Sequence, residues 1–511
     1  MDHTQASEMS ELVIHMSENI NIQIQPNNFE YDIFTLVKAF YPEGQVNVLK
    51  DAEASEAGTA NLNIKNEESL ADRCDELLQV SFSDSKLEVS FAGKNKAADI
   101  DYSDRPETKN ILKRTLYDLL SEHTGITLPW GTLTGIRPVR MPLNMMEQGH
   151  SRLEAENFLR ETYYVSPEKI KLSCDVAQLE IETLKDIDYK QGYSMYVGIP
   201  FCPTICLYCS FTSFTADKWE GYMDQYLDTV EKELKALSGQ FNREPDTIYI
   251  GGGTPTVLSP ERMHRLLCCI EDNFDISRVR EFTVEAGRPD TITEAKLRVL
   301  REHGITRISI NPQTMNQKTL DLIGRRHSVE DISATYHLAK NLGFENINMD
   351  LIVGLPGENI EDVRNTLKQV IALNPENVTI HSLAVKRAAR LNLFKDKYQE
   401  MGMINNSQIM GLTEELLGEA GYRPYYLYRQ KNMAGNFENV GYSKPGFEGV
   451  YNILIMEEKQ TIAACGAGSS TKKVFPDGER IERYINPKDI KTYLDKIDEI
   501  IDKKRQLLEE E

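Results

Sequence analysis

The sequence predicts an α/β fold built from repeated strand–helix units, and two features indicate it. From Met195 onward, short apolar runs alternate with longer amphipathic segments such as Lys218–Leu237, the pattern of a parallel sheet with connecting helices. Six strand–helix units fit either a partial barrel or an open doubly wound sheet. In both folds the active site lies at the carboxyl ends of the strands. The expected strands are Met195–Ile199, Thr247–Ile250, Glu281–Glu285, Arg307–Asn311, Asn346–Val353 and Val378–His381.

The residues before these units favour a separate module. Alternating apolar residues over Asn19–Ile24 predict a strand, and Val80–Phe82 with Leu87–Phe91 predict a hairpin. A helix is expected near Pro106–His123. We therefore expect an N-terminal α+β module of unknown role over residues 1–150 and a helical connector over 151–190.

The residues after the sixth run are less regular. A helix is expected near Ser407–Ala420, followed by the aromatic stretch Tyr422–Arg429, and the charged tail Ile490–Glu511 is expected to be a solvated helix. At 511 residues the chain exceeds the usual size of one hydrophobic core, so several domains are expected. We assign the strand–helix part to residues 191–383 and a C-terminal, substrate-side extension with its helical tail to 384–511.

Composition narrows the class of protein. The chain is 40% hydrophobic and 27% charged, like an ordinary globular protein, and its net charge of -21 disfavours nucleic acid as a partner. No window reaches the roughly 18 apolar residues of a membrane span, and the first ten residues do not resemble a signal peptide. We expect a cytoplasmic protein without a membrane span, in which the eight cysteines are reduced and clustered cysteines bind metal.

Three cysteines follow the first expected strand directly. Cys202, Cys206 and Cys209 stand in a C-x3-C-x2-C pattern, and soft thiolate ligands favour zinc or an iron–sulfur cluster. A closed structural zinc site needs four ligands, usually from two C-x2-C arms, and the nearest other pair, Cys268 and Cys269, points to two different faces of a helix. Three ligands on a cubane cluster instead leave one iron open to bind a substrate or cosubstrate, so the cluster is the favoured interpretation.

A glycine run follows the second expected strand. Gly251, Gly252 and Gly253 lack side chains and permit a ligand to approach the backbone closely. The run is followed by Thr254, but it lacks the lysine of a phosphate-binding Walker loop and the spacing of a dinucleotide-binding fingerprint. By itself it is equally typical of a flexible turn.

The cysteine loop and the glycine run together resemble the radical S-adenosylmethionine (SAM) superfamily. More narrowly, Tyr196–Cys202 and Gly251–Thr256 resemble oxygen-independent coproporphyrinogen III dehydrogenases and their haem-chaperone relatives, over about Tyr196–Ser382. The flanking regions, including Gly435–Tyr442, are similar to the long branch found in Gram-positive bacteria. The resemblance implies a partial (β/α)6 barrel with an N-terminal α+β module and a C-terminal α/β extension. It also implies a [4Fe-4S] cluster and one SAM molecule or two.

The resemblance also implies roles for individual residues. The three cysteines would hold the cluster, and Tyr196 would lie beside it. The methionine end of SAM would be lined by Gly252 and Gly253 with Thr254 nearby, and its adenine would contact Tyr208. The acidic cosubstrate contact would be Glu285.

Three further residues match positions that contact SAM or substrate in the family: Gln313, Arg325 and Asp350. Each also has an ordinary structural explanation. Arg325 suits a helix C-terminus, Gln313 could satisfy loop carbonyls, and Asp350 could cap a loop. Their shared location beyond strand ends favours a functional role.

The implied substrate, coproporphyrinogen III, carries four carboxylates and would need cationic partners, for which arginine is best suited. Lys386, Arg387, Arg390 and Arg429 are the candidates, unless they are ordinary surface charges. The implied reaction is oxidative decarboxylation to protoporphyrinogen IX by a 5′-deoxyadenosyl radical, in haem biosynthesis. The electron donor would be a protein such as a flavodoxin or ferredoxin.

Two departures keep other functions open. Phe211 occupies the place of a further cysteine that the decarboxylases carry, and it is shared instead with the haem chaperones. The His-Asn pair and the Tyr-Trp of those chaperones are not reproduced in Tyr451–Met456, which retains only the Asn. The alternatives are a haem- or porphyrin-binding chaperone-like protein and a radical SAM enzyme acting on another tetrapyrrole.

Overall fold

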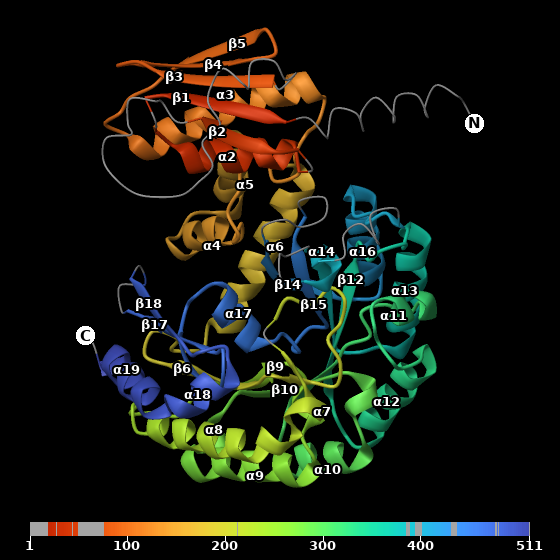
Figure 1. Cartoon of the computed structure of the whole chain (residues 1–511). Helices are drawn as coiled ribbons and strands as arrows, with labels where there is room; N and C mark the ends of the chain where they lie inside the picture. Colours follow the sequence, from red (N-terminus) through yellow and green to blue (C-terminus); the bar gives the residue numbers. More distant parts are fainter. Residues whose placement is uncertain are drawn as a thin grey trace. The chain divides into compact units, whose positions relative to one another are not determined.

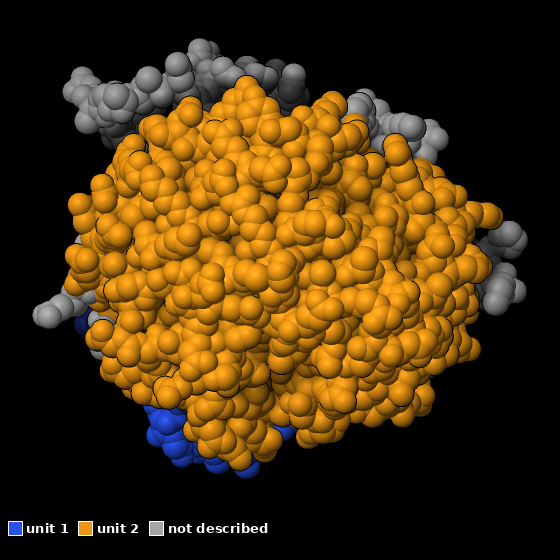
Figure 2. Space-filling view, turned by 90° about the horizontal axis from the view of Figure 1, so that it is seen from below, with its two compact units in different colours: residues 1–174 blue, residues 175–511 orange. Residues whose placement is uncertain are grey.

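A computed structural model describes residues 19–26, 28–42, 44–49, 76–211, 213–384, 389–393, 401–430, 437–475, 478 and 480–509. The chain forms two compact units, residues 1–174 and residues 175–511, which Figure 2 colours separately. The finer division into four parts stays a prediction. None of the helices in the described ranges combines the length and the apolar character that crossing a membrane requires.

The first unit is an α+β module, as expected. Its sheet has the order β2-β1-β3-β4-β5, in which β1 runs parallel to β2 and β3 while β4 runs antiparallel to both of its neighbours. The hairpin predicted near Ser83–Lys86 is the β3–β4 connection. The elements are β1 (Ile20–Gln25), α2 (Glu30–Phe40), β2 (Val46–Leu49), β3 (Glu76–Phe82), β4 (Lys86–Phe91), β5 (Lys94–Asp99), α3 (Arg105–Thr124), α4 (Arg140–Glu147) and α5 (Arg152–Tyr163).

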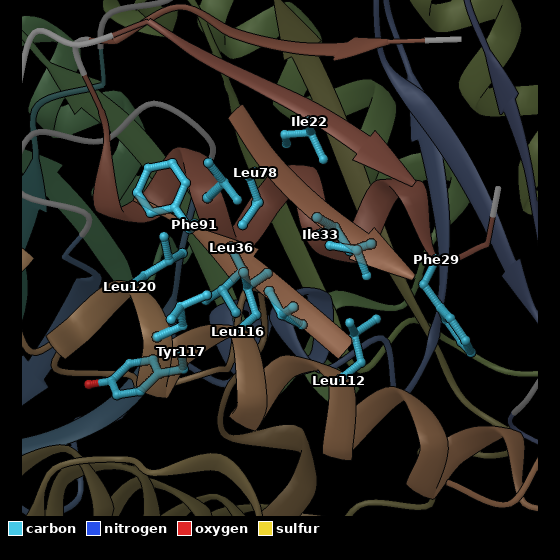
Figure 3. Packing of buried hydrophobic residues seen from close by; sticks show 14 of the residues in the cluster. Ile22, Phe29, Ile33, Leu36, Leu78, Phe91, Leu112, Leu116, Tyr117 and Leu120 are labelled. Atoms are coloured by element: carbon cyan, nitrogen blue, oxygen red, sulfur yellow. The ribbon is translucent and has the colours of Figure 1, made fainter. Parts of the chain in front are cut away.

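One face of this sheet packs against α2 and α3. Ile22 of β1 and Leu78 of β3 point toward Leu36 of α2 and Leu116 of α3 (Figure 3), and all four are fully buried. Burying each such side chain contributes roughly 1.5–3 kcal/mol. The strict alternation of buried and exposed residues along β4 shows why the sequence pattern revealed these strands.

The second unit contains the predicted barrel. Six parallel strands follow one another in the order β6-β9-β10-β11-β12-β13, and the strands expected from the sequence are confirmed. Helices cover the outside of the sheet (Figure 1). The strands are β6 (Tyr193–Ile199), β9 (Thr247–Gly252), β10 (Glu281–Gly287), β11 (Arg307–Ile310), β12 (Asn346–Val353) and β13 (Asn377–Ser382); the helices are α8 (Met223–Ser238), α9 (Pro260–Asn273), α10 (Glu294–Glu302), α11 (Gln317–Leu322), α12 (Val329–Asn341) and α13 (Ile360–Leu373).

The C-terminal part extends this sheet at both of its edges. On one side β15 pairs antiparallel with β13 and carries β14; on the other, β16 pairs parallel with β6 and carries β17 and β18. Helix α17 connects the two additions, and its Tyr451 stacks on Tyr249 of β9 with ring centroids 4.5 Å apart. These elements are α14 (Arg390–Leu393), α16 (Ser407–Glu419), β14 (Arg423–Tyr428), β15 (Asn439–Ser443), α17 (Val450–Met456), β16 (Thr461–Cys465), β17 (Ser470–Val474) and β18 (Ile481–Ile485).

The expectation of a solvated C-terminal helix is wrong. Residues 490–509 form α18 (Ile490–Asp495) and α19 (Ile497–Glu509), which bury one face. Lys504 lies fully buried, with its Nζ 2.5 Å from Glu233 Oε1, and the hydroxyl of Tyr493 donates to Glu233 Oε2 at 2.6 Å. A buried carboxylate requires such partners, so the tail is part of the core of this unit.

Candidate active site

The three predicted cluster ligands lie on one loop after β6. This strand ends at Ile199, and the short strand β7 (Phe201–Cys202) pairs with β8 (Phe214–Thr215) to close the loop. The amide of Cys209 donates to the carbonyl of Cys206 at 3.2 Å, which forms a turn between these two ligands. The hydroxyl of Thr254 lies 3.5 Å from Cys202 Sγ. The loop stands at the carboxyl end of the parallel strands, where barrel enzymes carry their chemistry.

A buried arginine lies beside the cysteine loop. Arg288 is 3% exposed, and its Nη1 donates to Thr204 Oγ1 at 2.7 Å and lies 3.7 Å from Cys206 Sγ. Its Nε and Nη2 donate to the two carboxylate oxygens of Asp290 at 2.9 and 2.6 Å. Burial acts to raise the pKa of Asp290, but His327, whose Nδ1 lies 3.8 Å from Asp290 Oδ1, and the hydrogen bonds and charge of Arg288 hold it well below its usual range. Asp290 therefore holds the positively charged guanidinium of Arg288 beside Cys206.

The glycines are required by close packing. A Cβ on Gly253 would stand 2.5 Å from the carbonyl oxygen of Phe201, and one on Gly251 would stand 2.8 Å from the Glu285 carboxylate. Gly252 has a φ of +106° and a Cβ there would lie 3.1 Å from the hydroxyl of Tyr196. The end of β9 thus fits against both β6 and the acidic side chain of β10, with no room for larger residues.

Glu285 is the predicted acidic contact, and it lies inside the barrel next to β9. The Tyr249 hydroxyl donates to its Oε1 at 2.5 Å, and the Gly252 amide donates to its Oε2 at 3.2 Å. Tyr249 stands between Tyr196 and Tyr451 in a row of parallel rings. The Glu285 carboxyl is therefore held by two hydrogen-bond donors, and one of them, Tyr249, belongs to the row of aromatic rings.

Two carboxyl groups here have opposite pKa shifts. Burial is the main cause that raises the pKa of Glu285 to about 7, and the neighbouring charge of Asp350 adds to it. Burial also acts on Asp350, but His381, whose Nε2 lies 3.8 Å from Asp350 Oδ1, and the hydrogen bond from Asn348 Nδ2 at 2.7 Å outweigh it and lower its pKa. Neighbouring carboxyls with such different pKa values are typical of functional sites, because one can donate while the other accepts.

Gln313, Arg325 and Asp350 were all expected beyond the ends of strands, and Asp350 is the exception. Asp350 lies within β12 and neither follows a strand nor caps a loop. Gln313 adopts a left-handed backbone with φ of +69°, and its amide donates to the carbonyl of Asp350 at 2.9 Å, which joins the two residues. Arg325 follows the last turn of α11 and is 6% exposed.

Arg325 connects to the cysteine loop. Its Nη2 donates to the hydroxyl of Tyr208 at 3.0 Å and its Nη1 to the carbonyl of Asn311 at 2.6 Å. Its buried Nε has no hydrogen-bond partner among the described residues. A buried guanidinium with an unsatisfied N–H is costly unless a polar ligand supplies the missing acceptor.

Two of the four predicted substrate residues, Arg390 and Arg429, lie in the described part of the chain. Lys386 and Arg387 lie outside the described residues. Arg390 is exposed at the start of α14, whereas Arg429 is buried just after β14. Burial is the main cause that lowers the pKa of Arg429 to about 10, partly opposed by the charge of Glu438. Phe211, after the third cysteine, is 70% exposed.

Sequence reasoning missed Arg288, Asp290 and Tyr249. Arg288 comes directly after β10 in the same way as the cysteine loop follows β6, so the rule of strand ends could have pointed to it. Tyr249 lies within a predicted strand and carried no separate signal.

The barrel and the three-cysteine loop define the class as radical SAM enzymes. The model of the Radical SAM superfamily matches residues 196–370. The chain is 43% identical over 410 residues to the "Oxygen-independent coproporphyrinogen-III oxidase-like protein HemZ" of Bacillus subtilis, which covers 79% of this chain and 82% of that protein. The chain belongs to the radical SAM superfamily and, within it, to the coproporphyrinogen-III oxidase-like proteins related to HemZ.

Two further relatives extend the comparison. The heme chaperone HemW of Lactococcus lactis is 31% identical over 283 residues, covering 54% of this chain and 69% of the relative. The solved structure of coproporphyrinogen III oxidase HemN from Escherichia coli aligns with a TM-score of 0.51 and 25% identity, covering 63% of this chain and 72% of that one. The chain is thus a radical SAM oxidoreductase whose relatives have names connected with haem.

The site fits the cofactors that the family implies, a [4Fe-4S] cluster and SAM. Three thiols on one loop offer a donor set suited to a cluster with one open iron, and the unsatisfied Nε of buried Arg325 suits a polar ligand beside it. The residues that would hold the cluster are Cys202, Cys206 and Cys209. When bound, the cluster and SAM together supply a 5′-deoxyadenosyl radical.

Proposed function

We propose that this protein catalyses the oxygen-independent oxidative decarboxylation of coproporphyrinogen III to protoporphyrinogen IX. In each of two propionate side chains, one β-hydrogen atom leaves to the 5′-deoxyadenosyl radical, carbon dioxide leaves, and one electron passes to an external acceptor, which gives a vinyl group. A small electron-transfer protein such as a flavodoxin or ferredoxin would supply the reducing electron that radical formation needs. The 43% identity to HemZ over most of both chains is the observation that carries this proposal.

Cosubstrate binding would use side chains of several strands. Arg325 would donate its free Nε–H to a polar group of SAM. Near neutral pH, Asp350 accepts hydrogen bonds while Glu285 can carry a proton, so the pair offers both an acceptor and a donor to one ligand. Gly252 and Gly253 keep the backbone at the end of β9 close to β6 and to Phe201, and their missing side chains would let SAM approach the backbone.

Substrate binding would use cationic and aromatic groups on the C-terminal addition. Arg429 lies buried beside the tyrosines of β14, and Tyr426 stacks parallel to Tyr428 with ring centroids 6.3 Å apart. A guanidinium beside aromatic faces suits a flat macrocycle with carboxylate arms. We propose Arg429 and Arg390, together with Lys386 and Arg387, as contacts to the propionates.

A haem-binding, chaperone-like function is the second candidate. The relationship to HemW favours it, as does Phe211, which stands where the decarboxylases carry a cysteine. A carrier would bind haem without cleaving SAM in response to coproporphyrinogen.

One anaerobic experiment separates the two. Reconstituted protein is incubated with dithionite, SAM and coproporphyrinogen III, and 5′-deoxyadenosine and porphyrin products are followed by mass spectrometry. The enzyme should form 5′-deoxyadenosine together with products that have lost one and then two carboxyl groups. Cys206→Ala should abolish both, whereas Cys174→Ala, a buried cysteine in the first unit, should not.

Two results would reject the decarboxylase proposal. Untouched coproporphyrinogen with slow, substrate-independent 5′-deoxyadenosine would show radical chemistry on another substrate. Stoichiometric haem binding without either product would favour the carrier. For the substrate contacts, Arg429→Gln should raise the KM for coproporphyrinogen at least several-fold. Arg423→Gln, at an exposed arginine that begins the strand preceding Arg429, serves as the matched control.

A further inference from the structure

Two histidines and a cysteine meet on the outer helices of the barrel, on elements that carry none of the residues of the candidate active site. His264 and Cys268 are four residues apart on α9, so their side chains lie on the same face of the helix. His303 is the residue that ends α10, the next helix in the outer layer (Figure 1). Figure 2 looks onto the unit from the side on which these helices lie.

The potential ligand atoms of these three side chains all lie within 4.8 Å of one another. The Sγ of Cys268 is 3.6 Å from His264 Nε2 and 3.9 Å from its Nδ1, while His264 Nδ1 is 2.7 Å from His303 Nε2. In tetrahedral zinc sites, with Zn–N of about 2.0–2.1 Å and Zn–S of about 2.3 Å, neighbouring donor atoms lie roughly 3.3–3.7 Å apart. An imidazole binds an ion through one nitrogen only, and Nδ1 is the His264 nitrogen that faces His303. With Nδ1 as the donor, its distance to Cys268 Sγ would have to shorten by roughly 0.3 Å, and its distance to His303 Nε2 would have to lengthen by roughly 0.6 Å.

This adjustment is available because the three residues differ in burial. His264 is exposed and Cys268 is half-buried, whereas His303 is only 6% exposed. The buried histidine therefore fixes the position of the site, and the exposed histidine can rotate toward an ion that enters from solvent. A metal site needs such an entry path.

The carboxylate of Glu271 determines which nitrogen of His303 is available. His303 Nδ1 lies 2.7 Å from Glu271 Oε1, and a carboxylate can only accept, so Nδ1 carries the proton and Nε2 keeps its lone pair toward His264 and Cys268. A carboxylate that orients a histidine in this way is a common support of metal ligands. The charges of Glu271 and Asp272 also act on Cys268 and favour a cation there.

A plain hydrogen bond between the two imidazoles would explain the 2.7 Å distance without any metal. It would not explain why a third soft donor lies one helical turn away, or why the accepting ring is oriented by a carboxylate. The nitrogen and sulfur donors together select a borderline-soft divalent metal over calcium or magnesium.

We propose that His264, Cys268 and His303 form a binding site for one divalent transition-metal ion, with Zn²⁺ as the preferred ion, separate from the three-cysteine loop. Three protein ligands leave the fourth position to water. The ion would join α9 to the end of α10 and so stabilise the outer layer of the barrel. The site is independent of the proposed substrate.

The test uses the full-length protein with its cluster reconstituted, so that the three loop cysteines are occupied by iron. Zinc is titrated in competition with a chromophoric chelator, and zinc-edge X-ray absorption is recorded on the one-equivalent sample. We expect one zinc per chain beyond the iron, with one sulfur at about 2.3 Å and two nitrogens at about 2.0–2.1 Å. His264→Asn and Cys268→Ser should each weaken zinc binding at least 10-fold without loss of iron.

The number of sulfur ligands on zinc distinguishes this site from zinc bound at the three loop cysteines. Zinc with three sulfur ligands would be bound at the loop cysteines and would overturn the proposal, and so would zinc bound only by nitrogen and oxygen. Affinity unchanged in both variants, or no zinc retained by the wild type, would also overturn it. His337→Asn, at an exposed histidine on α12, is the matched control and should leave zinc affinity unchanged. Because His264 is exposed, its variant should fold normally, and the iron content checks this directly.

Discussion

Arg325 donates a hydrogen bond from Nη2 to the hydroxyl of Tyr208 at 3.0 Å, between residues that are 117 positions apart in the sequence. This contact joins the segment that follows α11 to the cysteine loop. The buried Nε of Arg325 has no hydrogen-bond partner in the described part of the chain. Arg325 thus supports the loop, and we propose that its remaining N–H donates to a ligand.

We predict that Arg325→Lys weakens SAM binding at least 10-fold while the iron content stays at the wild-type level. Lysine keeps the charge but loses the fixed fork of donors that reaches Tyr208, Asn311 and a ligand at once. Equilibrium dialysis of SAM against reconstituted protein measures the effect, with the exposed neighbour Arg326→Lys as control. Equal affinity of wild type and Arg325→Lys would remove Arg325 from the cosubstrate site.

Arg288 should influence the reduction potential of the cluster. A buried cation 3.7 Å from Cys206 Sγ stabilises added negative charge, so Arg288→Gln should lower the midpoint potential by on the order of tens of millivolts. Iron content should remain, because none of the three ligands is changed. A redox titration followed by electron paramagnetic resonance measures the potential, and a value equal to that of the wild type would show that Arg288 only supports the loop mechanically.

The raised pKa of Glu285 implies a dependence of stability on pH. The folded pKa of about 7 lies above the ordinary value of 4.5, so the unfolded chain releases this proton first as pH rises. Stability from this group is therefore lost between about pH 4.5 and 7. Glu285→Gln should be more stable than the wild type, and its advantage should be larger at pH 8 than at pH 6 by on the order of 1 kcal/mol.

Unfolding of the SAM-free protein by denaturant at the two pH values tests this prediction. The glutamine can still accept from Tyr249, so the comparison isolates the charge. An advantage that does not change with pH would mean that Glu285 titrates near its ordinary value.

Phe211 should affect substrate binding more than cosubstrate binding. An aromatic ring that is 70% exposed, two residues after the third cysteine, is placed to pack against a flat macrocycle. We expect Phe211→Ala to raise the KM for coproporphyrinogen several-fold and to leave SAM affinity unchanged. Leu153→Ala, which removes a similarly exposed apolar side chain from the first unit, is the control. Equal KM values for Phe211→Ala and the wild type would exclude this contact.

The barrel strands could be predicted from the sequence, but the packing of the C-terminal strands and helices against the barrel could not. The barrel strands could be predicted because they are short apolar runs that alternate with amphipathic helices along the chain. The pairing of β16 with β6 could not, because it joins Thr461 to Tyr193 and nothing in a five-residue strand specifies so distant a partner. The buried tail was missed for the same reason, since Lys504 finds Glu233 at a separation of 271 residues.

In the candidate site, too, local sequence motifs could be predicted and contacts between distant residues could not. The cysteine loop and the glycine run are local motifs, so their spacing is readable without a structure. The contact of Arg288 with Cys206 and the row of Tyr196, Tyr249 and Tyr451 depend on how strands are arranged around the barrel. Glu285 and Asp350 were both candidates from the sequence, but their opposite pKa shifts follow from burial and hydrogen bonds that only the fold determines.

The most direct test of the proposed reaction uses coproporphyrinogen III that carries deuterium at the β-carbons of its propionates. The anaerobic reaction is quenched within a few turnovers, and the 5′-deoxyadenosine is analysed by mass spectrometry. We predict that one deuterium appears in each 5′-deoxyadenosine formed and that vinyl-containing porphyrin accumulates with it. Unlabelled 5′-deoxyadenosine in the presence of the labelled substrate would contradict abstraction from the propionate and, with it, the proposed function.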